Sequence, residues 1–240
     1  MFKLIRRKKK KKLQHSKIAR KLVTISGGKS YILEQFRTIR TNITFSMTDQ
    51  ELKTILVTSS TPGEGKSTNA ANLGVVFAQE GKRVLIIDGD LRKPTLHHTF
   101  KTFNKVGLSK VLTKKASIEE AIQETFIVGL YVITSGPIPP NPSELLSSNA
   151  MDELVLEVQK DYDIIIIDSP PLLSVSDAQI LANKCDGTIL IVNAGVVEKS
   201  AVQKAKAILS TTHSKILGVV LNNYMTPGHQ KYYEEYSFVE

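Results

Sequence analysis

The sequence predicts an α/β fold in which a doubly wound, mainly parallel sheet carries helices on both faces. Short runs rich in Ile, Val and Leu alternate with segments of helical periodicity, and such continuous apolar runs are typical of parallel strands buried on both faces. Polar residues follow several of these runs, at the strand ends where ligands bind in sheets of this class. The predicted strands are residues 54–58, 83–87, 130–133, 163–167, 188–192 and 216–221.

Length and charge predict the domain organisation. A chain of 240 residues can bury the core of one α/β domain with short tails. The formal net charge is +9, but residues 1–21 hold eleven Lys or Arg and no acid. Because the rest of the chain is nearly neutral, a fold that grips nucleic acid across its surface is not favoured. We expect a disordered basic arm over 1–28, one domain over 29–222 and a flexible tail over 223–240.

The first elements of the domain follow from periodicity. Apolar side chains recur at spacings of three or four residues between Ile32 and Ile43, which predicts an amphipathic helix over 29–47. The strand 54–58 follows, and a second helix is predicted over about 67–79. The segment between this strand and this helix is therefore the place to look for a ligand site.

That segment, Thr-Pro-Gly-Glu-Gly-Lys-Ser at residues 61–67, has the composition of a phosphate loop of the P-loop NTPase type. Its glycines let backbone N–H groups approach phosphate, Lys66 neutralises phosphate charge, and Ser67 offers a hydroxyl to Mg²⁺. The strict pattern has glycine where Ser60 stands, although a small residue still fits; the alternative is an ordinary glycine turn. The predicted nucleotide-binding residues are Pro62, Gly63, Glu64, Gly65, Lys66, Ser67, Thr68 and, after the last strand, Asn222.

Carboxylates follow two further strands. Asp168 ends the run 163–167, where it can hold Mg²⁺ or merely cap a turn. Asp88 and Asp90 follow the run 83–87 as a pair. Transfer of a phosphoryl group to a hydroxyl uses one carboxylate for the proton and others for Mg²⁺, whereas the alternative is an acidic turn neutralised by basic neighbours. We predict Lys66, Asp88, Asp90 and Asp168 as catalytic residues, and Ser67 and Asp168 as metal ligands.

These segments resemble the Walker A, Walker A′ and Walker B motifs of bacterial tyrosine kinases from capsular and exopolysaccharide biosynthesis systems. The segment Gly-Pro-Ile-Pro-Pro-Asn-Pro-Ser-Glu-Leu at 136–145 is also similar to the signature of that family, and the resemblance covers about residues 30–240. It implies a P-loop kinase domain that uses ATP and Mg²⁺. It also implies that Asp88 activates the tyrosine hydroxyl while Asp90 assists the metal.

The C-terminal tail carries the predicted phosphate acceptors. Four of the seven tyrosines fall within the last 17 residues, in a stretch with Gly, Pro and charge that builds no regular element. The resemblance implies autophosphorylation of Tyr232, Tyr233, Tyr236 and Tyr224 by a neighbouring subunit. The alternative is that these tyrosines dock the terminus onto the domain, and for Tyr224 docking is favoured.

The first helix also carries a charged stripe. Glu34, Arg37 and Arg40 follow one another at spacings of three residues. Such a stripe is usually a solvated surface, but the resemblance implies subunit contacts in a ring-shaped homo-oligomer.

The remaining partners follow from the arm and the resemblance. Each Lys or Arg near an anionic leaflet contributes about 1 kcal/mol, so the arm can hold the protein at a membrane surface. The resemblance implies a transmembrane adaptor, a tyrosine phosphatase and a role in polysaccharide synthesis and export. The single cysteine, Cys185, fits a reducing cytoplasm, and no apolar run reaches the ~20 residues of a membrane span. We therefore expect a cytoplasmic protein at the inner face of the membrane.

Two other functions fit parts of the sequence. The first is a partition or positioning ATPase switch that acts on DNA or membrane. Such switches usually carry a second lysine near the start of the phosphate loop and lack a terminal tyrosine cluster. This chain has no lysine at that place and has a tyrosine cluster near its C-terminus. The second is a catalytically silent, nucleotide-dependent scaffold, which the intact Lys66 and three aspartates disfavour. The kinase interpretation accounts for more of the residues than either.

Overall fold

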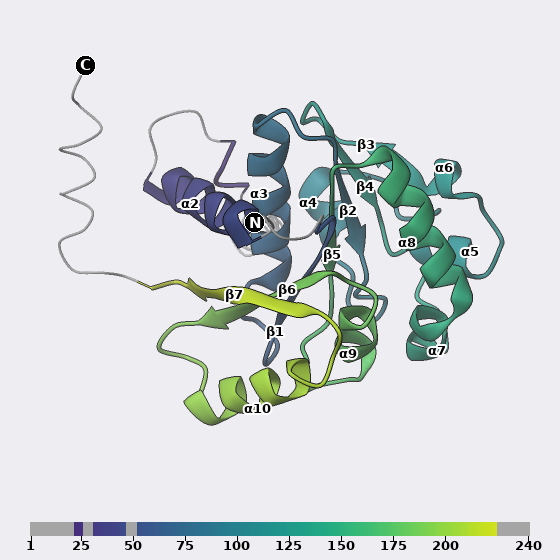
Figure 1. Ribbon diagram of the computed structural model, residues 1–240. Helices are drawn as coiled ribbons and strands as arrows, with labels where there is room; N and C mark the ends of the chain where they lie inside the picture. Colours follow the sequence, from purple (N-terminus) through teal and green to yellow (C-terminus); the bar gives the residue numbers. More distant parts are fainter. Residues whose placement is uncertain (1–21, 26–30, 47–51, 225–240) are drawn as a thin grey trace, which may run out of the picture.

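A seven-stranded sheet forms the centre of the computed structural model, which describes residues 22–25, 31–46 and 52–224 (Figure 1). The strand order is β3-β4-β2-β5-β1-β6-β7, and every neighbouring pair is parallel except β3 and β4. The predicted doubly wound, mainly parallel sheet is confirmed. The strands are β1 (Thr54–Ser59), β2 (Val84–Asp88), β3 (Ile122–Glu124), β4 (Leu130–Ile133), β5 (Ile164–Asp168), β6 (Gly187–Asn193) and β7 (Lys215–Asn222).

All six predicted strands are present, and β3 is the strand that the sequence did not reveal. It has three residues, it is partly exposed, and it pairs antiparallel with β4 at the edge of the sheet. An edge strand this short needs no continuous apolar run, because only part of its surface packs on the core. Apolar patterning therefore could not identify it.

Helices cover both faces of the sheet (Figure 1). On one face, α2 packs on α3, and α3 is buried along most of its length against β1, β2 and β5. The other face is covered mainly by α8, α9 and α10. The helices are α2 (Tyr31–Ser46), α3 (Lys66–Gln79), α4 (Leu96–Phe100), α5 (Leu108–Leu112), α6 (Ile118–Ala121), α7 (Pro142–Ser147), α8 (Asn149–Asp161), α9 (Asp177–Ala182) and α10 (Lys199–Leu209).

The three central strands place the predicted motifs side by side. Strand β5 lies between β2 and β1, with Asp168 paired to Asp88 on one side and to Val57 on the other. Because the strands are parallel, the loops that follow all three leave the sheet at the same edge. The phosphate loop (residues 60–67), the segment after β2 and the segment after β5 therefore converge.

Residues 22–25 do not behave as a disordered arm. Thr24 is 3% exposed, and its N–H and hydroxyl donate to Asn72 Oδ1 at 3.1 and 2.8 Å. The Gln79 side chain in turn donates to the Thr24 carbonyl at 3.2 Å. The prediction of disorder over 1–28 is wrong for these four residues, because α3 satisfies the polar groups of Thr24 and fastens the segment there. The basic run at 6–12 lies outside the described residues.

The charged stripe on α2 divides into two parts. Glu34 and Arg37 form an exposed ion pair at 2.5 Å. Arg40 instead donates to the Val76 carbonyl at 3.0 Å and lies 3.5 Å from the carboxylate of Glu80. Its side chain therefore fastens α2 to α3, so only Glu34 and Arg37 remain available on the outer surface for the predicted subunit contact.

The chain leaves the sheet beside the phosphate loop. Tyr224 is 60% exposed just after β7, so the prediction that this tyrosine docks onto the domain is wrong. Tyr232, Tyr233 and Tyr236 lie outside the described residues. Within the described parts of the chain, none of the helices has the length and apolar character required to cross a membrane.

Candidate active site

The phosphate loop has the backbone geometry of an anion site. Gly63 and Gly65 have φ values of 87° and 90°, a region that favours glycine. A Cβ placed on Gly65 would lie 2.3 Å from Asn222 Nδ2, so a larger residue would collide there. Helix α3 begins at Lys66, and Gly65 at its N-cap makes no side-chain cap bond. The first backbone N–H groups of α3 therefore remain available to a phosphate.

Two predicted nucleotide ligands support the loop with their side chains. The buried carboxylate of Glu64 accepts hydrogen bonds from Thr61 N at 2.5 Å and Asn193 N at 3.1 Å. Asn222 Nδ2 donates to the Glu64 carbonyl at 2.8 Å. These contacts tie the loop to the ends of β6 and β7. A nucleotide contact from Glu64 is consequently limited to its backbone.

The other predicted loop residues surround the start of α3. Pro62 and Gly63 are exposed at the outer rim, and Ser67 is buried in the first turn of the helix. The carbonyl of Thr68 accepts a hydrogen bond from Asn72 Nδ2 at 2.8 Å. The first turn of α3 is thereby connected through Asn72 to the N-terminal segment at Thr24.

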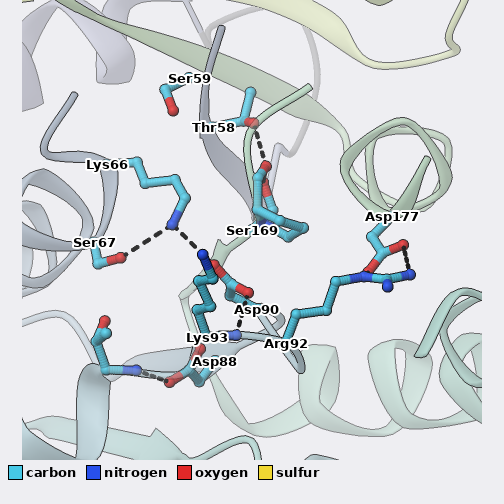
Figure 2. A network of polar contacts seen from close by, with 12 residues as sticks. Thr58, Ser59, Lys66, Ser67, Asp88, Asp90, Arg92, Lys93, Ser169 and Asp177 are labelled. Atoms are coloured by element: carbon cyan, nitrogen blue, oxygen red, sulfur yellow. Dashed lines mark hydrogen bonds and ion pairs between the residues drawn. The ribbon is translucent and has the colours of Figure 1, made fainter. Parts of the chain in front are cut away.

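Lys66 is the cation at the centre of the site (Figure 2). Its Nζ lies 3.1 Å from Asp90 Oδ2 and 3.4 Å from Ser67 Oγ. Burial lowers the pKa of Lys66, but the negative charges of Asp168, Asp90 and Asp88 outweigh this effect and raise it. Lys66 therefore stays protonated and faces three carboxylates at once.

Asp88 is fully buried at the end of β2. Its Oδ2 accepts hydrogen bonds from the N–H groups of Thr95 and Leu96, both at 3.1 Å. Its Oδ1 has no hydrogen-bond partner among residues 22–25, 31–46 and 52–224. Burial, followed by the charge of Asp168, raises the pKa of Asp88 to about 7, although the two N–H groups oppose the shift.

Asp90 and Asp168 complete the acidic group. Asp90 Oδ1 accepts a hydrogen bond from Lys93 N at 2.9 Å, while Asp168 is fully buried at the end of β5. The structure thus brings together all five predicted catalytic and metal-binding residues. Three or more His, Cys, Asp or Glu side chains do not converge as a cation site within the described ranges. A magnesium ion would therefore also depend on Ser67 and on phosphate oxygens, as Mg²⁺ commonly does.

Arg92 has a partner that the sequence did not reveal. Instead of neutralising Asp88 or Asp90, its guanidinium pairs with Asp177 of α9, at 2.9 Å between Nε and Oδ2. Ser143 of α7 donates to Asp177 Oδ1 at 2.6 Å. Ser143 belongs to the segment 136–145 that marked the family resemblance, but no local pattern marks Asp177. Only the fold brings these three residues together.

Comparisons with known proteins agree with this geometry. Residues 52–216 match the family described as AAA domain. The chain is 51% identical over 222 residues to tyrosine-protein kinase YwqD of Bacillus subtilis (strain 168), covering 92% of this chain and 94% of that protein. It is 41% identical over 190 residues to tyrosine-protein kinase CpsD of Streptococcus agalactiae serotype III (strain NEM316), covering 79% and 81%.

Solved structures of similar fold include a bacterial tyrosine kinase domain. The kinase domain of Escherichia coli tyrosine kinase ETK superposes with a TM-score of 0.83 at 32% identity, over 87% of this chain and 82% of that one. The cell division ATPase MinD of Pyrococcus furiosus shares the fold less closely, with a TM-score of 0.64 at 27% identity over 78% and 80%. The chain therefore belongs to the bacterial tyrosine-protein kinases, and it is an enzyme of the protein-tyrosine kinase class.

Proposed function

We propose that this kinase transfers the γ-phosphoryl group of Mg·ATP to tyrosines of its own C-terminal tail, in trans between subunits. We propose further that it thereby regulates capsular or exopolysaccharide synthesis and export together with a transmembrane adaptor. The observation that carries the catalytic part is the buried Asp88, which has one oxygen without a hydrogen-bond partner among the described residues and lies beside the Lys66 and Asp90 ion pair.

Mg·ATP suits the charge and shape of the site. The two glycines at positive φ and the N-terminus of α3 suit phosphate oxygens, and Lys66 would neutralise their charge. Ser67, Asp90 and Asp168 would hold Mg²⁺, which supplies charge stabilisation to the phosphate oxygens when bound. Three carboxylates facing one lysine leave an excess of negative charge, so a dication is favourable here.

Asp88 is the better proton acceptor of the paired aspartates. Its pKa of about 7 lies close to physiological pH, where a general base works best. Asp90 instead contacts Lys66 and Lys93 N with its two oxygens, which suits the metal and phosphate side. As the phenolic oxygen bonds to the γ-phosphorus, Asp88 would take the hydroxyl proton, and the bond to the ADP leaving oxygen would break.

The start of the tail supports the choice of acceptor. Asn222 contacts the phosphate loop, and the chain leaves β7 two residues before the exposed Tyr224. The tail thus begins at the edge of the active site, within reach of its own site or a neighbour's. We propose Tyr232, Tyr233, Tyr236 and Tyr224 as acceptors. The exposed pair of Glu34 and Arg37 is the proposed subunit contact of a ring-shaped oligomer.

A mixing experiment tests acceptor and direction together. A Lys66→Met chain with an intact tail is combined with an active chain whose four tail tyrosines are changed to Phe, and labelled ATP with Mg²⁺ is added. We expect label on the tail of the Lys66→Met chain, mapped to Tyr232, Tyr233 or Tyr236. An unlabelled tail on the Lys66→Met chain, while the unmodified protein labels its own tail in a parallel sample, would contradict the trans reaction. Hydrolysis of ATP without tyrosine label would instead indicate a nucleotide switch.

The membrane-related proposals have their own test. The eleven basic residues among 1–21 would attract anionic lipid at the inner face of the cell membrane. We expect cosedimentation of the full chain with phosphatidylserine vesicles, lost when residues 1–21 are removed and absent with phosphatidylcholine vesicles. Equal binding to both vesicle types would contradict the proposal.

A tyrosine phosphatase that reverses the tyrosine phosphorylation is proposed as a further partner.

A further inference from the structure

Arg92, Asp177 and Ser143 form a compact polar cluster (Figure 2 shows Arg92 and Asp177). The guanidinium binds the carboxylate at two points, with Nε 2.9 Å from Oδ2 and Nη2 3.1 Å from Oδ1. The Ser143 hydroxyl donates to Asp177 Oδ1 at 2.6 Å and accepts from Arg92 Nη2 at 3.0 Å. We call these three residues the Arg92 cluster.

The Arg92 cluster joins the segments that follow three neighbouring strands. Arg92 lies in the A′ loop, residues 89–95, which connects β2 to α4. Asp177 lies in the first turn of α9 after β5, and Ser143 lies in α7 after β4. The order β4-β2-β5 makes these strands direct neighbours. The cluster is therefore a brace across the carboxyl ends of the strands that carry the acidic half of the site.

The A′ loop and the first residue of α4 donate hydrogen bonds to both members of the aspartate pair. The N–H of Lys93, next to Arg92, donates to Asp90 Oδ1 at 2.9 Å. The N–H groups of Thr95 and Leu96 donate to Asp88 Oδ2. A shift of Arg92 would displace these N–H donors. The orientation of both carboxylates would then change as well.

The chemistry of the cluster suits a rigid attachment. Asp177 is fully buried, so its charge depends on Arg92 and Ser143 for compensation. A planar guanidinium that binds both carboxylate oxygens fixes orientation as well as distance, whereas a lysine would supply only a point charge. Arg92 itself is directed away from Lys66 and toward Asp177 in Figure 2.

We propose that Arg92, held by Asp177 and Ser143, is a positioning residue for phosphoryl transfer. It keeps the A′ loop, and through it the carboxylates of Asp88 and Asp90, aligned with Lys66. This inference rests on the roles proposed above for Asp88 and Asp90. A displacement of reacting groups by about 1 Å costs on the order of 100-fold in rate, so the brace should act on turnover. Nucleotide affinity should change little, because the phosphate loop is fastened separately through Glu64.

The test compares kcat and KM for ATP in the full chain, with tail phosphorylation as the readout. We expect Arg92→Ala and Asp177→Asn each to lower kcat by about 30-fold or more while KM for ATP stays within about threefold. Arg92→Lys should recover part of the loss. The double variant Arg92→Ala, Asp177→Asn removes the buried charge as well as its partner. Its kcat should be no lower than that of the single variants, because each single change already breaks the contact between Arg92 and Asp177.

A matched control separates positioning from general stability. Lys184 forms an ion pair with Asp152 that fastens the chain after α9 to α8, away from the A′ loop. Lys184→Ala should lower the melting temperature yet leave kcat within about twofold. Unchanged kcat in Arg92→Lys and in the double variant would overturn the proposal, as would parallel losses of kcat and ATP affinity. Full activity in Asp88→Asn and Asp90→Asn would instead refute the proposed site.

Discussion

Asp88 and Asp168 occupy paired positions on the neighbouring strands β2 and β5, and both side chains are fully buried. Burial opposes ionisation of Asp88, and the like charge of Asp168 adds to that opposition. The pKa of Asp88 is consequently raised to about 7, even though two backbone N–H groups favour its charged form. Burial and the pairing with Asp168 together therefore produce a carboxyl group that changes protonation near neutral pH.

The first prediction concerns the pH dependence of turnover. If Asp88 accepts the tyrosine proton, only its deprotonated form is active, so kcat should rise about tenfold per pH unit below about pH 7 and level off above it. Quenched-flow measurement of tail phosphorylation between about pH 5.5 and 8.5 checks this pH dependence, because a carboxyl group with a pKa near 7 titrates over roughly that range. A flat profile over that range would contradict the role of Asp88.

The second prediction concerns stability. The folded-state pKa of Asp88, about 7, exceeds the unfolded value of 3.8, so the folded chain binds the proton more tightly. The resulting stabilisation is complete below pH 3.8 and is lost as pH rises through about 7. Asp88→Asn, which keeps an oxygen for the N–H groups of Thr95 and Leu96, should therefore be inactive yet more stable at pH 8, by roughly 1–3 kcal/mol. Denaturant titrations of both chains at pH 8 measure the difference; a less stable variant would contradict the assignment.

The third prediction concerns Lys66. Lys66→Met removes the cation that faces three carboxylates, so we expect tail phosphorylation to fall by about 100-fold or more. Labelled ATP followed by phosphotyrosine detection measures the loss. The matched control is Lys160→Met, which removes an exposed lysine from an ion pair with Glu157 and should leave labelling unchanged. Persistent labelling in the Lys66 variant would show that the phosphate loop is misassigned.

The fourth prediction compares two glycines with nearly equal backbone φ angles. Gly65 and Gly81 have φ values of 90° and 88°, but only a Cβ on Gly65 would collide, 2.3 Å from Asn222 Nδ2. Gly81→Ala should cost about 1 kcal/mol of stability and no activity. Gly65→Ala should cost about 2–3 kcal/mol and weaken ATP binding at least about tenfold, because the loop must shift. Thermal melts and a fluorescent ATP analogue measure both quantities; equal effects at the two glycines would count against the close contact.

The fifth prediction concerns the anchor of the N-terminal segment. Thr24→Val keeps the shape of the side chain but removes the buried hydroxyl that donates to Asn72 Oδ1. We expect a loss of about 1–2 kcal/mol in unfolding free energy. Thr38→Val removes an exposed hydroxyl bonded within α2 and should be close to neutral. A neutral Thr24 variant would mean that the segment contributes nothing to the domain.

Local features of the chain were predictable because their causes are local. The apolar runs of the six strands and the periodicity of α2 reflect burial of neighbouring residues, and the phosphate loop depends on backbone geometry within a few positions. Asp88, Asp90 and Asp168 were identifiable because each follows a recognisable strand, and parallel strands bring their ends to one edge. The three-residue strand β3 could not be predicted, because a short, partly exposed edge strand carries no continuous apolar run.

Short-range periodicity and spacing encode the sheet, the phosphate loop and the acidic residues at the strand ends. The pairing of polar side chains, in contrast, is set by long-range contacts in the folded domain. Thr24 meets Asn72 across 48 positions, Arg40 meets Val76 across 36, and Arg92 meets Asp177 across 85. The physical reason is that a buried charge or hydroxyl takes whichever partner the fold brings within about 3 Å, and sequence distance places no limit on that choice.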